Sequence, residues 1–456
     1  MSETQPIRHR YLPMTPADQE EMLGTIGASS IEDLFADIPE EVRFCGKLPV
    51  SSALDEAALL KHLKILAGRN ADSERYMSFL GAGIYDHHIP VVIGHMLSRS
   101  EFYTAYTPYQ AEISQGELQA IFEFQSYICE LTGMAVANAS MYDGATALAE
   151  AGALACAAVQ RRRLAVSQGV HPEAREILRT TARGLGLEVV EVPCRDGVTD
   201  LEALREAVTP ETAAVLVQSP NFFGCIENLR AIEPEAHAHG GLLGVSVNPL
   251  SLGLLEAPGR LGADIVTGDA QPLGLSASLG GPTCGFFAVT SALMRRMPGR
   301  IVGQTTDREG RRGFVLTLQT REQHIRRERA TSNICSNQAL LALGASVYLS
   351  LMGREGIAEA ARLNLNKAHY AAGVLSRIPG VCLAYGSPFF NEFTLKLPEG
   401  TDVPALRRSL LRDGYLAGHD LGSVDPALQG QLLIAVTERR TREEINAFAQ
   451  RLEAWL

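Results

Sequence analysis

The chain has 456 residues, of which 46% are hydrophobic and 20% charged, so it can bury a large core and has a length typical of two or three domains. Its net charge of -11 argues against non-specific nucleic-acid binding, which requires clustered positive charge. No stretch approaches the roughly 18 apolar residues of a membrane span, and the start has no apolar signal core. The eight cysteines form no CxxC pair and no zinc-ligand spacing, so we expect a reduced, cytoplasmic protein without a metal site.

Residues 1–65 are predicted to form a helical arm. Thr15-Pro16 places a proline in the first turn of one helix, and 30–36 and 55–67 are predicted as the next two. An arm of this kind is more typical of a segment that packs on a neighbouring molecule than of one that works alone.

Two longer helices are predicted after the arm. Ser114-x-x-Glu117 has the spacing of a capping box and precedes apolar residues at helical intervals, with Gly133 placed to end that helix. The second helix is predicted to begin near Asp143-Gly144 and to continue to about residue 159.

From residue 164 onward, strands that are apolar throughout alternate with helices. This alternation indicates a mostly parallel sheet covered on both faces, so we expect 66–335 to be one large α/β domain. A short helix is expected to be capped by Thr199-x-x-Glu202. The predicted strands are 164–167, 187–192, 213–218, 242–247, 264–267 and 285–289, and the longer predicted helices between them are 172–183 and 229–239.

Residues 336–456 are predicted to contain a linking helix and a small α+β domain. The helix spans 336–352 and continues after Gly356. Strands at 391–397 and 432–436, a helix at 403–413 and a final helix opened by a Thr441-x-x-Glu444 capping box complete the domain.

Lysine is absent from residues 65–366, which include almost the whole predicted α/β domain. The chain has five lysines among 41 basic residues, at positions 47, 61, 64, 367 and 396, so a general preference for arginine is the simpler explanation to weigh. A large α/β domain invites a pyridoxal phosphate hypothesis, and that chemistry normally begins from a lysine Schiff base. The predicted domain has no residue that could form one.

A phosphate-binding turn has one local candidate, the small-residue segment that opens the second long helix. Phosphates favour helix N-termini at the carboxyl ends of sheet strands. Asp143 is a common helix cap that would repel a phosphate, so the structural interpretation of this turn is favoured. The segment consists of Tyr142, Asp143, Gly144, Ala145 and Thr146.

Two other patterns carry little weight. Gly81-Ala82-Gly83 begins like a dinucleotide-binding loop but lacks the third glycine. His87, His88 and His95 invite a metal hypothesis, but adjacent side chains point in different directions on any regular element, which disfavours a shared site.

Two dense patches suit either solvated surface or a subunit contact. The first, 102–110, gathers three tyrosines around a proline, and tyrosines are common in pockets and interfaces. The second, 321–335, combines four arginines with small polar residues, and arginine forks serve anion recognition and ion pairs alike.

Taken together, several long and unusual segments closely resemble the glycine cleavage system P-protein family, and in particular the α subunits of its two-subunit members. The resemblance covers nearly the whole chain. The segments are FLGAGIYDHHIP (79–90), YTPYQAEISQGELQAIFEFQ (106–125), ANASMYDGATALAEA (137–151), GADIVTGDAQPLG (262–274), GGPTCGFFA (280–288) and REQHIRRERATSNICSNQAL (321–340).

The resemblance implies a fold-type-I pyridoxal phosphate architecture, with a large domain, a small C-terminal domain and an N-terminal arm. In the catalytic half of the family a His-Lys pair follows a strand, and the lysine holds the cofactor. Gln271-Pro272 stands at that position here, and proline forms no Schiff base. The resemblance therefore implies that a partner β subunit carries pyridoxal phosphate in an α2β2 assembly, decarboxylates glycine, and passes the aminomethyl group to the lipoyl group of H-protein.

Fold-type-I dimers commonly build their active sites at the subunit interface, so residues of this chain are expected to approach the partner's site. Two alternatives stay open: an enzyme active alone, which the missing lysine disfavours, and a structural or regulatory subunit that binds a ligand in its own degenerate pocket. The interface candidates are Tyr106, Tyr109, Gln110, Arg327, Thr331, Ser332 and Asn333.

Overall fold

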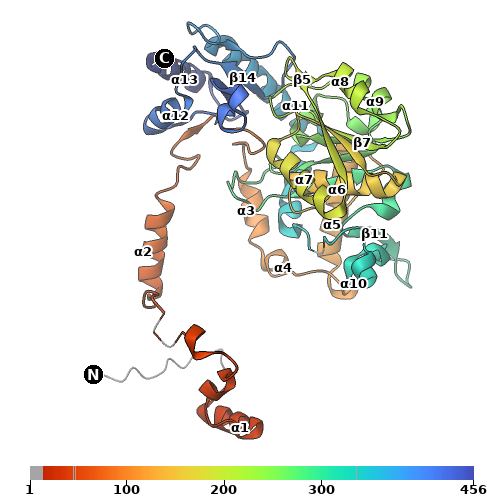
Figure 1. Cartoon of the computed structure of the whole chain (residues 1–456), viewed down its shortest axis with the longest axis vertical. Coiled ribbons are helices and arrows are strands. Elements are labelled where there is room, and N and C mark those ends of the chain that lie inside the picture. The colour runs from red at the N-terminus through yellow and green to blue at the C-terminus, as the bar shows by residue number, and fades with distance from the viewer. Residues whose placement is uncertain (1–13, 45, 47, 335) are drawn as a thin grey trace. The chain divides into compact units, whose positions relative to one another are not determined.

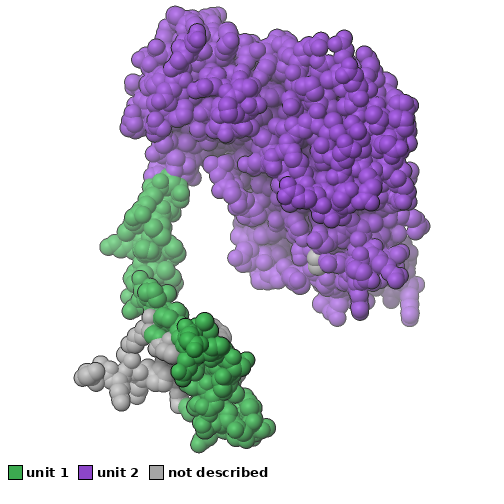
Figure 2. All heavy atoms as spheres, viewed as in Figure 1, with its two compact units in different colours: residues 1–70 green, residues 71–456 purple. Residues whose placement is uncertain are grey.

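The computed structural model describes residues 14–44, 46, 48–334 and 336–456. Cys45, Lys47 and Cys335, named or counted in the sequence analysis, lie outside these residues. The chain divides into two compact units, 1–70 and 71–456, shown in different colours in Figure 2.

In the first unit, two α-helices lie where the sequence predicts them. Helix α1 (Pro16–Ile26) has a complete capping box between Thr15 and Asp18, and α2 (Glu56–Ala67) is capped by the Asp55 carboxylate. The predicted helix at 30–36 is a single 3-10 turn, Ile31–Phe35. Neither α-helix has a buried residue, so their apolar side chains find no core within this unit.

The second unit is built around a seven-stranded sheet in the order β2-β10-β9-β8-β7-β3-β4. The pairs from β9 through β4 are parallel, whereas β10 runs antiparallel to both β9 and β2. This confirms the predicted mostly parallel sheet. The strands are β2 (Val136–Ala137), β3 (Arg163–Ser167), β4 (Glu188–Val192), β7 (Thr212–Gln218), β8 (Leu242–Val247), β9 (Ile265–Asp269) and β10 (Gly285–Val289).

Helices cover both faces of this sheet (Figure 1). Alternate residues of a strand point to opposite faces, so Val215 packs with one set of helices and Leu216 with the other. On the first face lie α5 (Gln115–Thr132), α8 (Leu201–Ala207), α9 (Leu229–His237) and the start of α11 (Ala339–Leu375), and on the second lie α6 (Gly144–Val159) and α7 (Pro172–Leu185).

Two predicted caps are wrong. Ser114 has φ -122° and ψ 23° after a short 3-10 turn, and its side chain makes no cap hydrogen bond to α5. Thr199 belongs to a short strand and its hydroxyl pairs with Ser167, while the Asp200 carboxylate caps α8. In both cases the backbone leading into the helix, which the spacing of residue types does not reveal, decides which side chain reaches the free N–H groups.

A β-hairpin that the sequence analysis did not predict follows the sheet. Strands β11 (Ile301–Thr306) and β12 (Arg312–Thr317) pair in antiparallel register across a turn closed by the Asp307 carboxylate. The hairpin packs on α5, where Gln115 bonds the backbone of Phe314. It is followed by the one-turn helix α10 (Gln323–Arg326).

The C-terminal part contains a four-stranded sheet in the order β13-β14-β17-β16. Gly353, with φ 60°, interrupts α11 close to the predicted break. The predicted Thr441–Glu444 capping box is present at the start of α13. The elements are β13 (Cys382–Leu383), β14 (Glu392–Lys396), β16 (His419–Asp420), β17 (Gln431–Ala435), α12 (Val403–Arg412) and α13 (Arg442–Trp455).

The segment 79–90 connects this C-terminal part to the seven-stranded sheet. It begins at β1 (Met77–Ser78), which pairs with β15 (Tyr415–Leu416), and Phe79 stacks on Phe448 of α13 with ring centroids 4.1 Å apart. It ends before α3 (Val91–Leu97), which packs against α11, and α4 (Ser100–Tyr103) follows. The segment is therefore placed to contact both sheets.

Candidate functional site

A cavity of about 270 Å³ lies at the carboxyl ends of three parallel strands. Gln218 ends β7, Val247 ends β8 and Asp269 ends β9, and all three line it. Open α/β sheets bind ligands at this edge. The N-terminus of α6, the start of α7 and residues 82–85 complete the wall.

Pro272, at the position where the family resemblance places a lysine, lines the cavity. Its neighbour Gln271 is fully buried and turns to the protein interior. The Gln271 side-chain oxygen accepts the N–H of Tyr85 at 3.0 Å, and its Nε2 donates to the carbonyls of Tyr85 at 2.9 Å and Leu275 at 3.0 Å. Gln271 is therefore a clamp on segment 79–90, and none of the described residues lining the cavity is a lysine.

The predicted phosphate turn does reach the cavity, through Asp143, Gly144 and Ala145. Two of its N–H groups already have carboxylate partners. The Asp143 carboxylate accepts the N–H of Thr146 at 2.7 Å, and the Asp269 carboxylate accepts that of Gly144 at 3.0 Å. The first contact agrees with the predicted helix cap at Asp143, whereas the second was not predicted.

Asp269 is held by three donors. Besides Gly144, the Thr283 hydroxyl donates to it at 2.8 Å and the Gln271 N–H at 2.9 Å. Burial raises the pKa of Asp269, and these hydrogen bonds act in the opposite direction. The position of Asp269, an acid that ends an apolar strand, is a signal for this site that is visible in the sequence.

His171, also missed, stands at the cavity as the residue before α7. Its Nδ1 accepts the N–H of Glu173 at 3.2 Å, so Nε2 carries the hydrogen donated to the Ala82 carbonyl at 2.9 Å. Burial lowers the pKa of His171, which favours the neutral ring.

Glu392, a buried carboxylic acid of β14, holds the other side of segment 79–90. Its oxygens accept the Ala82 N–H at 2.7 Å and the Tyr85 hydroxyl at 2.9 Å. Burial raises the pKa of Glu392 to about 7. A Cβ at Gly81 would lie 1.9 Å from the Glu392 carboxylate, so this close approach requires glycine.

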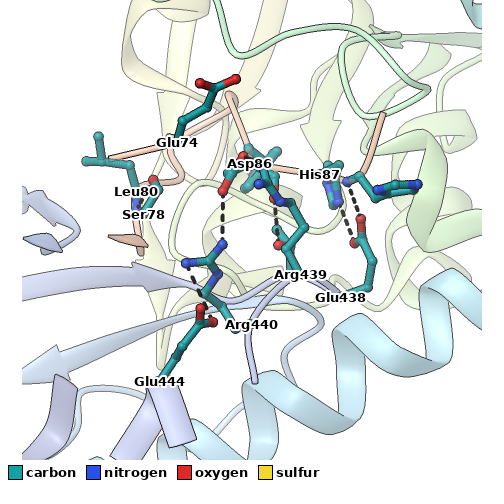
Figure 3. A network of polar contacts seen from close by, with 12 residues as sticks. Glu74, Ser78, Leu80, Asp86, His87, Glu438, Arg439, Arg440 and Glu444 are labelled. Carbon is teal, nitrogen blue, oxygen red and sulfur yellow. Dashed lines mark hydrogen bonds and ion pairs between the residues drawn. The ribbon is translucent and has the colours of Figure 1, made fainter. Parts of the chain in front are cut away.

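The same segment is tied to the chain before α13, as Figure 3 shows. Asp86 forms ion pairs with Arg439 and with Arg440, the latter at 3.2 Å. The Glu438 carboxylate contacts His87 Nδ1 at 2.8 Å and accepts the His88 N–H at 2.6 Å. Burial opposes ionisation of Glu438, but the contacts with these histidines lower its pKa to about 2.

Among the described residues, His87, His88 and His95 do not form a metal site. His87 binds Glu438, and His95 lies on α3. Over residues 14–44, 46, 48–334 and 336–456, no group of three or more His, Cys, Asp or Glu side chains could hold a metal ion.

One interface candidate, Tyr109, is part of a built cluster. Arg300 is 4% exposed, donates to the Tyr109 hydroxyl at 3.1 Å and has its guanidinium carbon 5.4 Å from the ring centroid. Arg300 also pairs with buried Glu322 at 3.8 Å, and His324 packs edge-on to Tyr109. The structure thus brings the two dense patches of the sequence together, through an arginine that the sequence analysis missed.

None of the seven interface candidates, Tyr109 included, lines the cavity. Tyr106 is 81% exposed, and Gln110 is exposed as well. Arg327, Thr331 and Asn333 are exposed, whereas Ser332 is half-buried and accepts the N–H of Ile334.

Among the described residues we find no helix that could span a membrane.

Residues 9–452 match the family model described as "Glycine cleavage system P-protein". Two curated relatives named "Probable glycine dehydrogenase (decarboxylating) subunit 1" are each 58% identical: one from Anoxybacillus flavithermus over 97% of this chain and 98% of its own length, and one from Bacillus subtilis over 98% and 99%.

Solved structures agree with this similarity. A crystal structure of glycine decarboxylase (P-protein) of the glycine cleavage system, in inhibitor-bound form, has a TM-score of 0.88 and 44% identity, and the match covers 98% of this chain and all of that one. A Burkholderia pseudomallei sphingosine-1-phosphate lyase, at 18% identity and a TM-score of 0.65 over 92% of this chain and 93% of its own, shares the fold, which is the fold-type-I architecture. The chain belongs to the glycine cleavage system P-protein family.

Proposed function

We propose that this chain is the first, non-catalytic subunit of a two-subunit glycine dehydrogenase (decarboxylating). The relatives named as subunit 1 align with it over nearly their full lengths, and that name implies a second subunit. The observation that carries the proposal is Pro272, together with the absence of lysine among the described residues of the cavity. On this proposal the isolated chain is inactive.

Pyridoxal phosphate does not fit the residues of this cavity. A covalent site would need an amine where Pro272 stands, and a phosphate would need N–H groups that Asp143 and Asp269 already engage. We therefore assign the cofactor to the partner subunit, where it would supply the electron sink for glycine decarboxylation. In this scheme the lipoyl group of H-protein receives the aminomethyl group, and two copies of each subunit form an α2β2 complex.

The interface candidates are proposed to approach the partner's active site. Support comes from the exposure of Tyr106, Gln110, Arg327, Thr331 and Asn333, since exposed polar and aromatic side chains are available to a second subunit. Tyr109 is the best positioned, because buried Arg300 fixes its hydroxyl. Ser332 is the least accessible of the set.

We also propose a cytoplasmic location and a division into an arm (1–65), a large domain (66–335) and a linking helix with a small domain (336–456). The distinct cores of the seven-stranded and four-stranded sheets support a separate small domain, with residues 342–360 of the linking helix packed in the first core and residues 368–375 in the second. Separate expression of 336–456, followed by a test for cooperative unfolding, checks whether this part folds on its own.

The assignment of the cofactor is tested on the complex. The chain is purified alone and with its partner, treated with borohydride to fix any Schiff base, and mapped by peptide mass spectrometry. We expect reduced cofactor on a lysine of the partner only, and glycine-dependent CO2 exchange in the complex only. Fixed cofactor or exchange activity in the isolated chain would overturn the proposal.

The interface role is tested with Tyr109→Ala in the intact complex. Its matched control is Tyr103→Ala, which removes another exposed tyrosine that lies outside the predicted set. Misplacing groups near a reacting centre is costly, so we expect kcat to fall by about tenfold or more for the first variant and to be unchanged for the second. Equal activities for the two variants would refute the role of Tyr109.

A second candidate, a regulatory subunit that binds a small ligand in its own cavity, is favoured by the persistence of about 270 Å³ of space at the strand ends. Co-purification of a small molecule with the complex, identified by mass spectrometry and released by substitutions at the cavity, would support it.

A further inference from the structure

The N-terminus of α6 would be the natural anion site of this cavity. The first-turn N–H groups of a helix lack helical partners, and the helix dipole adds positive potential there. Such an end, placed at the carboxyl ends of parallel strands, is where α/β folds bind phosphate groups. In this chain α6 meets the cavity at Gly144 and Ala145.

Two carboxylates of the chain itself occupy this end. Asp143 belongs to the turn and caps the helix, as many aspartates do. Asp269 is different, because it comes from the end of β9, 125 residues further along the chain, and binds the Gly144 N–H from the side of the sheet. The Asp143 cap alone would suffice for the start of the helix, so the presence of the Asp269 carboxylate requires a separate explanation.

Asp269 and the start of α6 are in direct contact, so a phosphate could take the Gly144 N–H only in place of the Asp269 carboxylate. A Cβ at Gly144 would lie 3.0 Å from the Asp269 backbone nitrogen, so the helix start is pressed against the strand end. The Asp269 carboxylate also takes the Thr283 hydroxyl and the Gln271 N–H as donors. A phosphate would therefore have to displace the carboxylate and would meet Asp143 as well.

We infer that the Asp269 carboxylate occupies the phosphate position at the N-terminus of α6, so that the cavity rejects phosphorylated ligands. This inference rests on the proposed function, since it explains how the cavity stays free of the partner's cofactor. It attributes the exclusion of the cofactor to the negative charge of Asp269 at the start of α6 as well as to the missing lysine. Exclusion then extends to phosphate compounds that need no Schiff base.

Calorimetric titration of the full chain with inorganic phosphate tests the inference. We expect weak or undetectable binding to the unmodified chain, tighter binding to Asp269→Asn, which removes the charge, and the tightest to Asp269→Ala, which also frees the Gly144 N–H. The gain for Asp269→Ala should be about tenfold or more, which is within the range of a helix N-terminus acting on an anion.

Asp264→Asn is the matched control. It removes the same charge next to the opposite end of β9, where Asp264 contacts His237 rather than α6. We expect its phosphate affinity to equal that of the unmodified chain. Equal affinities for the Asp269 and Asp264 variants would overturn the inference, as would strong phosphate binding by the unmodified chain.

A second measurement needs no variant and so does not depend on the folding of Asp269→Ala. Pyridoxal phosphate and pyridoxal differ only in the phosphate, and the inference expects the unmodified chain to bind the phosphorylated compound no more tightly than the other. Tighter binding of pyridoxal phosphate by about tenfold would overturn it. That result would leave the proposed function standing if borohydride still fixed the cofactor on the partner alone.

Discussion

Glu392 and Glu438 hold the same segment, 79–90, and we predict that they make its stability depend on pH in opposite directions. The pKa of Glu392 is raised from 4.5 to about 7 by burial. A raised carboxyl pKa means that the folded state favours the protonated form, so the stabilisation is complete below about pH 4.5 and is lost as pH rises through about 7. One pKa unit corresponds to about 1.4 kcal/mol, so about 2.5 kcal/mol is lost between about pH 5 and 8.

The pKa of Glu438 is lowered from 4.5 to about 2, burial being outweighed by the contacts with His87 and His88. Its contribution is therefore complete above about pH 4.5 and is lost as pH falls toward about 2. At neutral pH we expect Glu438→Gln to destabilise the segment by about 2–3 kcal/mol, whereas Glu392→Gln should remove the loss of stability between about pH 5 and 8.

Hydrogen exchange measured by mass spectrometry reads both effects locally, because the N–H groups of Ala82, Tyr85 and His88 are all bonded within this site. Exchange rates are corrected for the intrinsic effect of pH, and peptides from β8 serve as the internal reference. If Glu392→Gln loses protection between pH 5 and 8 as steeply as the unmodified chain, the pKa argument for Glu392 is refuted.

Three further outcomes are expected. Gln271→Ala, which leaves three backbone groups without their partner, should weaken protection of segment 79–90 by about 2–4 kcal/mol, and unchanged exchange at Tyr85 would contradict the clamp. His237→Gln should lower the melting temperature at about pH 5.5 and have little effect above about pH 8. Burial disfavours the charged form of His237, but the contacts with Asp264 and Glu233 raise the pKa of its ring. Because the His237 side chain is 31% exposed, the loss of stability should stay below about 1 kcal/mol. Pro272→Lys alone should retain no pyridoxal phosphate after borohydride treatment, whereas the double variant Pro272→Lys with Asp269→Ala should retain it. Mass spectrometry of the treated proteins distinguishes the two results. Retention of the cofactor by the single variant would contradict the role given to Asp269.

Local patterns predicted the elements of this fold well. The apolar run at 285–289 is β10 to the residue, and the Thr441-x-x-Glu444 box opens α13, because both depend on neighbours in sequence. The Ser114-x-x-Glu117 box failed because a preceding 3-10 turn sets the backbone of Ser114. The β11–β12 hairpin was missed because its strands alternate weakly and its turn is charged.

The site was much less predictable than the elements. The lysine position was located through the family resemblance, and the Asp143 turn was found because it depends on residues adjacent in sequence. Contacts such as Ala82 with Glu392, 310 positions apart, or Gly144 with Asp269 arise only when the two sheets and their helices pack together. No periodicity in the sequence signals such pairs.

The hydrogen bonds of Gln271 also limit how easily this chain could acquire the His-Lys pair that the family resemblance places at 271 and 272. Introducing a lysine at 272 changes one side chain that lines the cavity, but introducing a histidine at 271 removes two hydrogen bonds to the Tyr85 backbone and a third to the Leu275 carbonyl. A variant that carries the His-Lys pair is therefore expected to be less stable than this chain unless segment 79–90 changes as well. The absence of a His-Lys pair at 271 and 272 is, in this sense, maintained by the packing of Gln271 as well as by the identity of the two side chains.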